Sequence, residues 1–218
     1  MKIIASSLFA AALLGVAAPA FAAGAAPAAP SPTPLGDTIS LEISPEWAAT
    51  SPNLYKDTYA KIGFSHSLGN GFSLGISVQQ TVPIAGKTGS FQPETTLGYK
   101  WKADALTFGI SGGVGYNSGT VGGAGLNKGD VVSAYYLVSG TIDWKLDSKW
   151  TWNVINARYR NAFDTTWITP KVATGLTYAI DARQATYVSV GYAWKDTGDV
   201  NGLLADKINA AVGYKLGF

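Results

Sequence analysis

The sequence contains no cysteine, and its 218 residues include one histidine and one methionine. Without cysteine the chain can form no disulfide, and it has no Cys/His cluster that could hold a transition metal. The single histidine, His66, leaves little material for acid–base chemistry. We therefore expect no metal site, no cofactor and no enzymatic activity.

An excess of charge of one sign is also lacking. The 16 Lys and Arg residues are nearly balanced by 14 Asp and Glu residues, for a formal net charge of +2. Removal of Lys2 with the leader described below takes 16 basic residues to 15, against 14 acidic ones, a net charge of +1. A chain this close to neutral has no electrostatic footprint for DNA or RNA, so we expect no nucleic-acid partner.

Long apolar runs are missing from all but the first residues of the chain. Met1 and Lys2 precede an apolar run from Ile3 to Ala18, and Ala20-Phe21-Ala22 forms an A-x-A cleavage pattern. This arrangement predicts a secretory signal peptide over residues 1–22; a membrane anchor is the alternative, but the run is short and ends in Ala-Pro-Ala. Because no later run reaches the length of a membrane helix, the exported chain can cross a membrane only as a closed barrel.

Residues 23–36 are rich in Pro and Ala, a composition that cannot join a β-ladder. We interpret them as a periplasmic linker, and a spacer is favoured over a partner-binding segment. The remaining residues, 37–218, form the expected folded domain.

The domain is built from segments that alternate apolar and polar residues, as β-strands do. In the first segment Ile39, Leu41 and Ile43 fall on one face, whereas Glu42 and Ser44 fall on the other. With 26 Gly, 11 Tyr, 8 Phe and 7 Trp, the composition also suits strands and turns. Strands are predicted near residues 37–47, 57–68, 72–82, 91–101, 105–116, 131–144, 149–160, 167–178, 184–194 and 208–218.

The seventh of these segments breaks its own alternation. Trp150, Trp152 and Val154 share one parity, and if it continued, Asn156 and Arg158 would face lipid. A β-bulge near residues 153–156 would return the arginines to the inside, because one extra residue reverses the parity of those that follow.

The connections between segments alternate in length. Long ones are expected near 48–56, 83–90, 117–130, 161–166 and 195–204, and tight turns near 70, 103, 147 and 182. Barrels of the outer membrane show this alternation, with long loops outside the cell and short turns in the periplasm. The predicted fold class is therefore all-β, a closed antiparallel up-and-down transmembrane β-barrel of about ten strands, with eight or twelve as alternatives. A soluble β-sandwich or lipocalin-like barrel is the rival, but the polar face carries too few charges for a soluble surface.

The last segment, Ile208 to Phe218, ends the chain on an aromatic residue, with Tyr214 and Leu216 on the same face. It resembles the C-terminal signature of bacterial outer-membrane β-barrel proteins. The resemblance implies a location in the bacterial outer membrane, contact with its lipid, and recognition of Tyr214, Leu216 and Phe218 by the barrel assembly machinery. It leaves the oligomeric state open.

The inward face of several segments consists of small residues, for example Thr107, Gly109, Ser111, Gly113 and Gly115. Small side chains leave space, so a narrow aqueous lumen is expected. The candidate lumen-lining residues are Glu42, Lys61, Glu94, Lys100, Gly109, Ser111, Gly113, Asp143, Arg158, Arg160, Lys171 and Lys215. The charged members could pair as a plug or form a selectivity constriction, depending on the register of the strands.

We expect a narrow porin-like channel for small polar solutes. A structural or adhesive barrel with a plugged lumen, acting through its extracellular loops, is the alternative, and a barrel enzyme is the second alternative. Barrel enzymes of similar size use His with Asp or Ser near the extracellular rim, whereas His66 is predicted at the periplasmic end on the lipid-facing parity.

Overall fold

The computed structural model describes residues 36–83, 89–118, 121–122, 125–126, 133–164, 168–196 and 202–218. The predicted signal peptide and all but the last residue of the predicted linker lie outside these ranges. No helix within them is long and apolar enough to cross a membrane.

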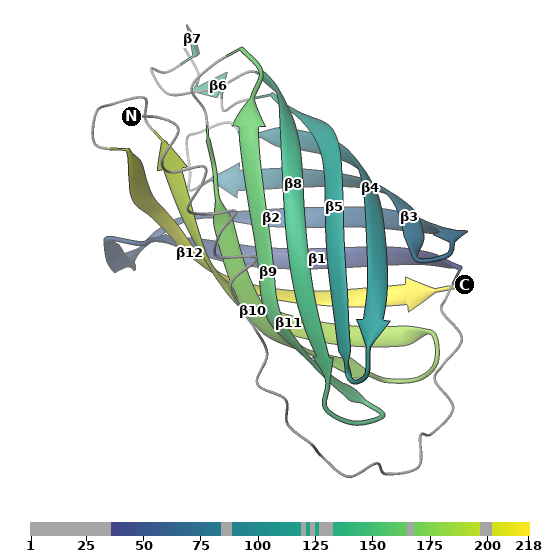
Figure 1. Ribbon diagram of the computed structural model, residues 1–218. Coiled ribbons are helices and arrows are strands. Elements are labelled where there is room, and N and C mark those ends of the chain that lie inside the picture. The colour runs from purple at the N-terminus through teal and green to yellow at the C-terminus, as the bar shows by residue number, and fades with distance from the viewer. Residues whose placement is uncertain are drawn as a thin grey trace. The chain divides into compact units, whose positions relative to one another are not determined.

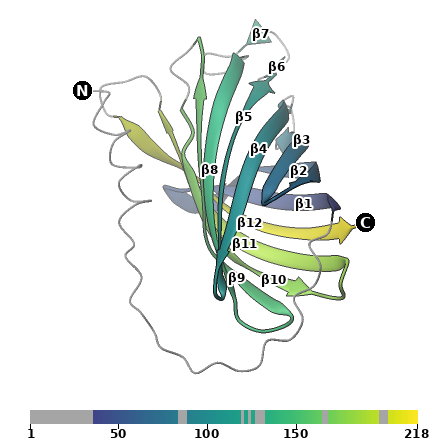
Figure 2. The ribbon, with the colours of Figure 1, turned by 45° about the vertical axis from the view of Figure 1, so that its right-hand side comes forward.

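Ten of the described strands close into one antiparallel barrel, as predicted (Figure 1). Their bounds are β1 Asp37–Ala48, β2 Ser51–Gly69, β3 Phe72–Pro83, β4 Phe91–Ala103, β5 Leu106–Asn117, β8 Ser133–Lys145, β9 Trp150–Ala162, β10 Lys171–Ala179, β11 Gln184–Asp196 and β12 Leu203–Gly217. Each strand pairs with the strand before and after it, and β5 pairs with β8 across the connection that holds a small hairpin, β6 Val121–Gly122 and β7 Gly125–Leu126 (Figure 2).

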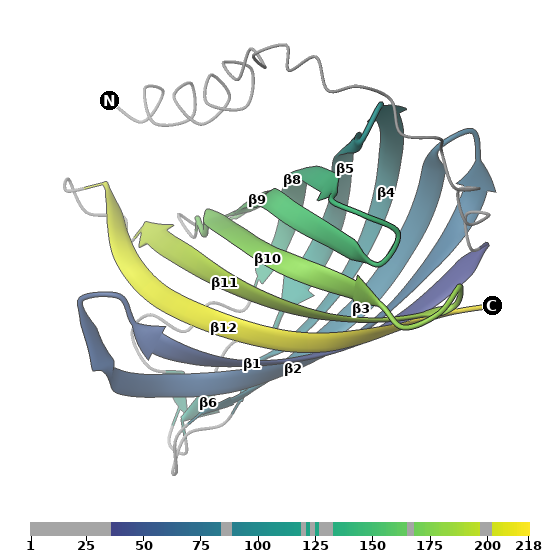
Figure 3. The same ribbon diagram turned by 90° about the horizontal axis from the view of Figure 1, so that it is seen from below.

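The barrel closes where the first strand meets the last (Figure 3). The pairing of β1 with β12 runs from Thr38 opposite Gly217 to Ala48 opposite Lys207. At its end the backbones of Asp37 and Phe218 exchange two hydrogen bonds, of 3.3 and 3.0 Å. The C-terminal strand therefore removes the free edge that β1 would otherwise expose.

The two faces of the strands separate apolar from polar residues, as the alternation predicts. In β1 the side chain of Ile43 is 56% exposed on the outside, whereas its neighbour Ser44 is completely buried on the inside. The same outward face carries large apolar residues on the other strands, among them Ile62, Phe64, Ile76, Leu97, Ile110, Val114, Val138, Val188, Val190 and Val212. A closed barrel with an apolar outside is the architecture of a transmembrane β-barrel.

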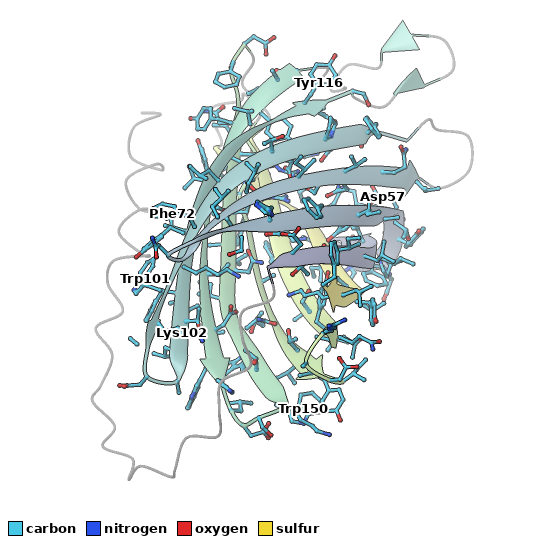
Figure 4. All side chains as sticks on the ribbon, turned by 90° about the vertical axis from the view of Figure 1, so that its right-hand side faces the viewer. Asp57, Phe72, Trp101, Lys102, Tyr116 and Trp150 are labelled. Carbon is cyan, nitrogen blue, oxygen red and sulfur yellow. The ribbon has the colours of Figure 1, made fainter. Side chains whose placement is uncertain are left out.

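Aromatic side chains gather on the outer face at the end of the barrel that has the tight turns. Ring centroids lie 4.7 Å apart for Phe72 and Tyr99, 5.8 Å for Tyr99 and Trp101, and 4.8 Å for Trp150 and Tyr178. Phe72, Trp101 and Trp150 lie at this end in Figure 4, away from the end marked by Asp57 and Tyr116. A ring of such residues is typical of the level where a membrane meets water.

The tight turns are confirmed near all four predicted positions. In the first, Gly69, Asn70 and Gly71 have φ values of +85°, +51° and +86°. A Cβ on Gly71 would lie 2.3 Å from the carbonyl oxygen of Lys100, so the turn requires glycine there.

Two later turns share one design. The Asp147 carboxylate accepts the backbone N–H groups of Lys149 and Trp150, both at 2.7 Å. The Asp181 carboxylate accepts those of Arg183 at 2.7 Å and Gln184 at 2.8 Å. These backbone hydrogen bonds, from Trp150 above all at one turn and from Arg183 at the other, lower the pKa of both carboxyls because they stabilise the charged form.

The prediction of a long connection at 48–56 is wrong. Strand β2 already begins at Ser51, and only Ala49 and Thr50 lie between it and β1. The segment S-P-N-L-Y-K has no alternation to predict a strand, and its pairing with β1 shifts register on both sides of Trp47. It is held instead by Asp206 of β12, whose carboxylate lies 2.8 Å from Lys56 Nζ.

Three other boundaries differ from the prediction. Strand β10 begins at Lys171 rather than near 167, because Pro170 has no N–H to donate to a ladder. The last long connection is shorter than expected, since β11 extends to Asp196 and β12 begins at Leu203. The long connection expected at 117–130 contains the β6–β7 hairpin, which was not predicted.

The predicted β-bulge is confirmed in β9. Toward β8, Asn153 lies opposite Asp143 but Ile155 lies opposite the adjacent Ile142, which leaves Val154 as the extra residue. The pairing of β9 with β10 shifts at the same point. Trp150 and Trp152 therefore face outward, whereas after the bulge the even-numbered residues, including both arginines, face inward.

Candidate functional site

The barrel encloses a cavity of about 550 Å³ that is lined by side chains from all ten strands. Its walls run from Thr38 and Ser73, close to the tight turns, to Glu94 and Lys171, closer to the long connections. Nine of the twelve predicted lumen-lining residues contribute: Glu42, Lys61, Glu94, Lys100, Gly109, Ser111, Arg158, Lys171 and Lys215. The cavity is therefore the candidate functional site.

Three predicted lumen residues do not line the cavity, although each lies on the inward parity. A Cβ on Gly113 would lie 2.1 Å from the carbonyl oxygen of Thr95, so this glycine is pressed against the neighbouring strand and faces no gap. Asp143 accepts a hydrogen bond of 2.7 Å from Asn153. Arg160 is buried in an ion pair. Parity gives the face of a residue but not the neighbours that cover it.

A buried polar layer surrounds Glu94. Its carboxylate forms an ion pair with Arg160 and accepts the Tyr135 hydroxyl at 2.9 Å. Arg160 also donates to Gln92 Oε1 at 3.0 Å and lies over the Tyr135 ring, 5.2 Å from its centroid. Gln92 in turn donates to Asn117 at 3.1 Å. This layer lies inside the barrel on the side of the long connections.

A second network surrounds Glu42. The hydroxyl of Tyr59 donates to one carboxylate oxygen at 2.7 Å, and the hydroxyl of Tyr187 donates to the other at 2.6 Å. Lys171 Nζ donates to the Tyr59 hydroxyl at 3.4 Å and lies over that ring. Both oxygens of Glu42 are thus satisfied by neutral donors at the cavity wall.

Two of the inward glycines make room for tyrosine rings rather than for solvent. Gly115 lies directly opposite Tyr135, and Gly213 directly opposite Tyr187. A Cβ on Gly115 would lie 2.5 Å from the Tyr135 ring, and a Cβ on Gly213 would lie 2.2 Å from the Tyr187 ring. The rings lie across the glycines and place their hydroxyls on the two glutamates. At these two positions the small inward residue therefore leaves no open space, unlike what was expected of such residues.

Sequence reasoning also missed a charged cluster nearer the long connections. Lys207 of β12 contacts Glu46 at 2.5 Å and Asp57 at 2.9 Å. Beside it Asn209 donates to Ser44 at 2.8 Å. The inward tyrosines could have been found from the parity of each strand. Asp57 is the first residue of its predicted strand, and Lys207 lies just before the predicted closing strand, so parity gave no signal for them.

The cavity wall has an excess of positive charge. Five basic side chains line it, against two carboxylates, which leaves a formal excess of three positive charges. The five are Lys61, Lys100, Arg158, Lys171 and Lys215. Only one of them lies within ion-pair distance of a lumen carboxylate among the described residues: Lys61, at 3.7 Å from Glu94.

His66 lies outside this site. It faces outward at the tight-turn end, as predicted, with its side chain 50% exposed and Nδ1 at 2.5 Å from the Asp37 carboxylate. Among the residues that the structure describes, no group of three or more His, Asp or Glu side chains could hold a metal ion.

Comparison with known proteins finds similarity only in the solved structures. No protein family matches the sequence, and no curated protein does. Neisserial surface protein A aligns with a TM-score of 0.40 and 11% identity, over 84% of this chain and 97% of its own. The KdgM porin in complex with disordered oligogalacturonate aligns with a TM-score of 0.42 and 13% identity, over 83% of this chain and 99% of its own. The NanC porin aligns with a TM-score of 0.46 and 11% identity, over 82% of this chain and 100% of its own. These alignments reach no further than a general likeness of barrel folds.

Proposed function

We propose that the protein is a bacterial outer-membrane barrel that acts as a narrow channel for small polar solutes. The observation that carries the proposal is the cavity of about 550 Å³, walled by small polar and charged side chains inside a barrel whose outside is apolar. Water and small solutes are stable in such an interior, because hydroxyl groups and charges replace part of their hydration. The long connections face the outside of the cell and the tight turns face the periplasm.

The layer around Glu94 makes the channel narrow. It narrows the lumen on the side of the long connections, where Arg160 and Tyr135 are buried against the glutamate. A solute must pass beside this layer, so the space left there sets the largest solute that can cross. Small residues such as Ser111 and Ser73 face the open part and offer no obstacle there.

The same layer favours a second candidate function. If the ion pair of Glu94 with Arg160 and its hydrogen-bonded neighbours close the lumen completely, the barrel is a plugged structural protein that acts through its loops. This candidate predicts no ion current, so one measurement separates it from the channel. We propose no catalytic role for the barrel.

The conductance of the refolded protein in planar lipid bilayers tests the channel. We expect current steps in the wild type and smaller steps in Ser111→Trp, because the indole occupies the cavity. The matched control is Ile110→Trp, which adds the same ring one residue away on the outward face and should leave the current unchanged. Absence of steps above the lipid background would refute the channel and leave the plugged barrel. Equal steps in all three proteins would also refute it, because the current would then not pass through the cavity beside Ser111.

We further propose that Tyr214, Leu216 and Phe218 are read by the barrel assembly machinery. All three lie on the outward parity of β12, and the ring of Phe218 lies 6.5 Å from that of Phe64. An exposed aromatic at the end of the closing strand is accessible to a partner before the barrel closes. Deletion of Phe218 should lower the assembled fraction in cells while refolding in detergent is retained.

A further inference from the structure

The wall of the cavity places two cations directly opposite one another. Arg158 of β9 and Lys171 of β10 are paired in register, and both line the cavity. The bulge at Val154 produces this arrangement, because without it Arg158 would face outward. Like charges directly opposite on neighbouring strands destabilise a sheet, so the pair needs a compensating partner.

The barrel places no carboxylate in direct contact with this pair. No Asp or Glu among the described residues lies within ion-pair distance of Arg158 or Lys171. Glu94 is engaged by Arg160 and Lys61, and both oxygens of Glu42 accept tyrosine hydroxyls.

The two cations also retain unused donors. Arg158 Nε is buried and has no hydrogen-bond partner, and Lys171 Nζ donates a long hydrogen bond to the Tyr59 hydroxyl, at 3.4 Å. A buried donor without a partner costs free energy, which a ligand that accepts from it would recover. Both groups line a cavity that a small ligand can enter.

Further positive charge surrounds the pair. Lys61 lines the same wall on β2, and Lys100 and Lys215 line the part of the cavity closer to the tight turns. Neutral donors lie among them, including Asn156, the inward residue that precedes Arg158 by two. The route from the tight-turn end to the pair is therefore positive, whereas its two carboxylates are already occupied.

We propose that Arg158 and Lys171 form a binding site for an oxyanion, namely the carboxylate, phosphate or sulfate group of a small solute. A guanidinium presents a planar fork of N–H donors that matches two oxygens of such a group, and an ammonium adds a mobile point charge. The bound anion neutralises the opposed cations and accepts from the free Arg158 Nε. This inference deepens the proposed channel function, on which it rests, by making anionic solutes the class that the channel prefers.

Equilibrium binding tests the site without any need for conduction. The probe is inorganic phosphate, titrated calorimetrically into the refolded barrel in a neutral detergent. Sulfate and acetate are titrated in separate experiments. We expect saturable phosphate binding that is weakened about tenfold or more in Arg158→Gln/Lys171→Gln. The matched control, Lys145→Gln/Lys149→Gln, removes two exposed positive charges beside a tight turn and should bind as the wild type does. If acetate alone binds, the site is specific for carboxylates.

Folding of the variants is checked by heat-modifiable migration on gels, and Lys171→Gln alone serves as a second variant. It relieves the repulsion, so without phosphate it should unfold no more easily than the wild type, while phosphate should stabilise it less. Absence of saturable binding of all three anions to the wild type, or equal binding by the Arg158→Gln/Lys171→Gln protein, would overturn the site.

Reversal potentials in a KCl gradient separate the two proposals. With the site present, the wild type should prefer chloride over potassium, and the Arg158→Gln/Lys171→Gln barrel should lose much of that preference. Binding without any current would support the site and refute the channel. Current without anion preference or binding would refute the site and leave the channel standing.

Discussion

Replacement of Glu94 by Gln should destabilise the barrel more than removal of any exposed carboxylate. Glu94 forms an ion pair with Arg160, accepts the Tyr135 hydroxyl at 2.9 Å and lies 3.7 Å from Lys61. The side chains of Glu94 and Arg160 are only 5% and 4% exposed, so water cannot replace the lost partner. The variant therefore leaves a buried cation without a counter-charge.

The expected cost is about 3 kcal/mol in the free energy of unfolding, the lower end of the range for breaking a buried ion pair from one side. Gln keeps an oxygen that can accept from Tyr135, which is why the lower end applies. The double variant Glu94→Gln/Arg160→Gln removes both charges, so it should cost little more than either single change, a coupling of about 1–3 kcal/mol.

Urea unfolding in lipid vesicles, followed by tryptophan fluorescence, measures these differences. The control is Asp37→Asn, which breaks the outward pair with His66; because that pair is half exposed, we expect at most about 1 kcal/mol. If Glu94→Gln cost no more than this control, or if the two single changes added without coupling, the account of a buried supporting layer would be refuted.

Three further changes test other parts of the structure. Val138→Arg places a charge on the outward face of β8 and should cost about 2–4 kcal/mol and impair insertion into vesicles; a stable, detergent-free soluble monomer would contradict the membrane assignment. Gly115→Ala should displace the Tyr135 ring and cost about 1–3 kcal/mol, with a changed near-ultraviolet circular dichroism spectrum; an unchanged spectrum would argue against the seated ring. Asp147→Ala should destabilise its turn only at pH values where the wild-type carboxylate is charged. Because folding lowers the pKa of Asp147, its contribution to stability is full above the unfolded pKa of about 4 and is lost as the pH falls through the folded pKa. The unfolding midpoints of the wild type and the variant should therefore converge in acid.

The alternation of residues was enough to predict the barrel, its ten strands and the face of most side chains. It also predicted the bulge in β9, because Arg158 on a lipid-facing parity is costly and one extra residue corrects it. The signal is strong because membrane and lumen impose opposite chemistry on successive residues of each strand.

The contacts inside the lumen could not be predicted in the same way. Gly113 and Gly115 share a parity and a strand, yet one is pressed against the backbone of β4 and the other seats the Tyr135 ring. The difference depends on the register of the neighbouring strands, which a single sequence does not contain. The irregular start of β2 was missed for a related reason, since its pairing with β1 shifts register twice and Lys56 pairs with Asp206 of β12, neither of which an alternation reveals.

Solvent access to one position inside the lumen shows whether the barrel is an open, water-filled channel. Because the chain has no cysteine, Ser111→Cys introduces a unique thiol in the cavity wall, and Ile110→Cys introduces one on the lipid-facing side. A negatively charged methanethiosulfonate reagent, added to bilayers that contain the refolded protein, should lower the current through Ser111→Cys irreversibly and leave Ile110→Cys unchanged. A Ser111→Cys barrel that carries no current, or whose current does not respond to the reagent, would contradict an open, water-filled lumen.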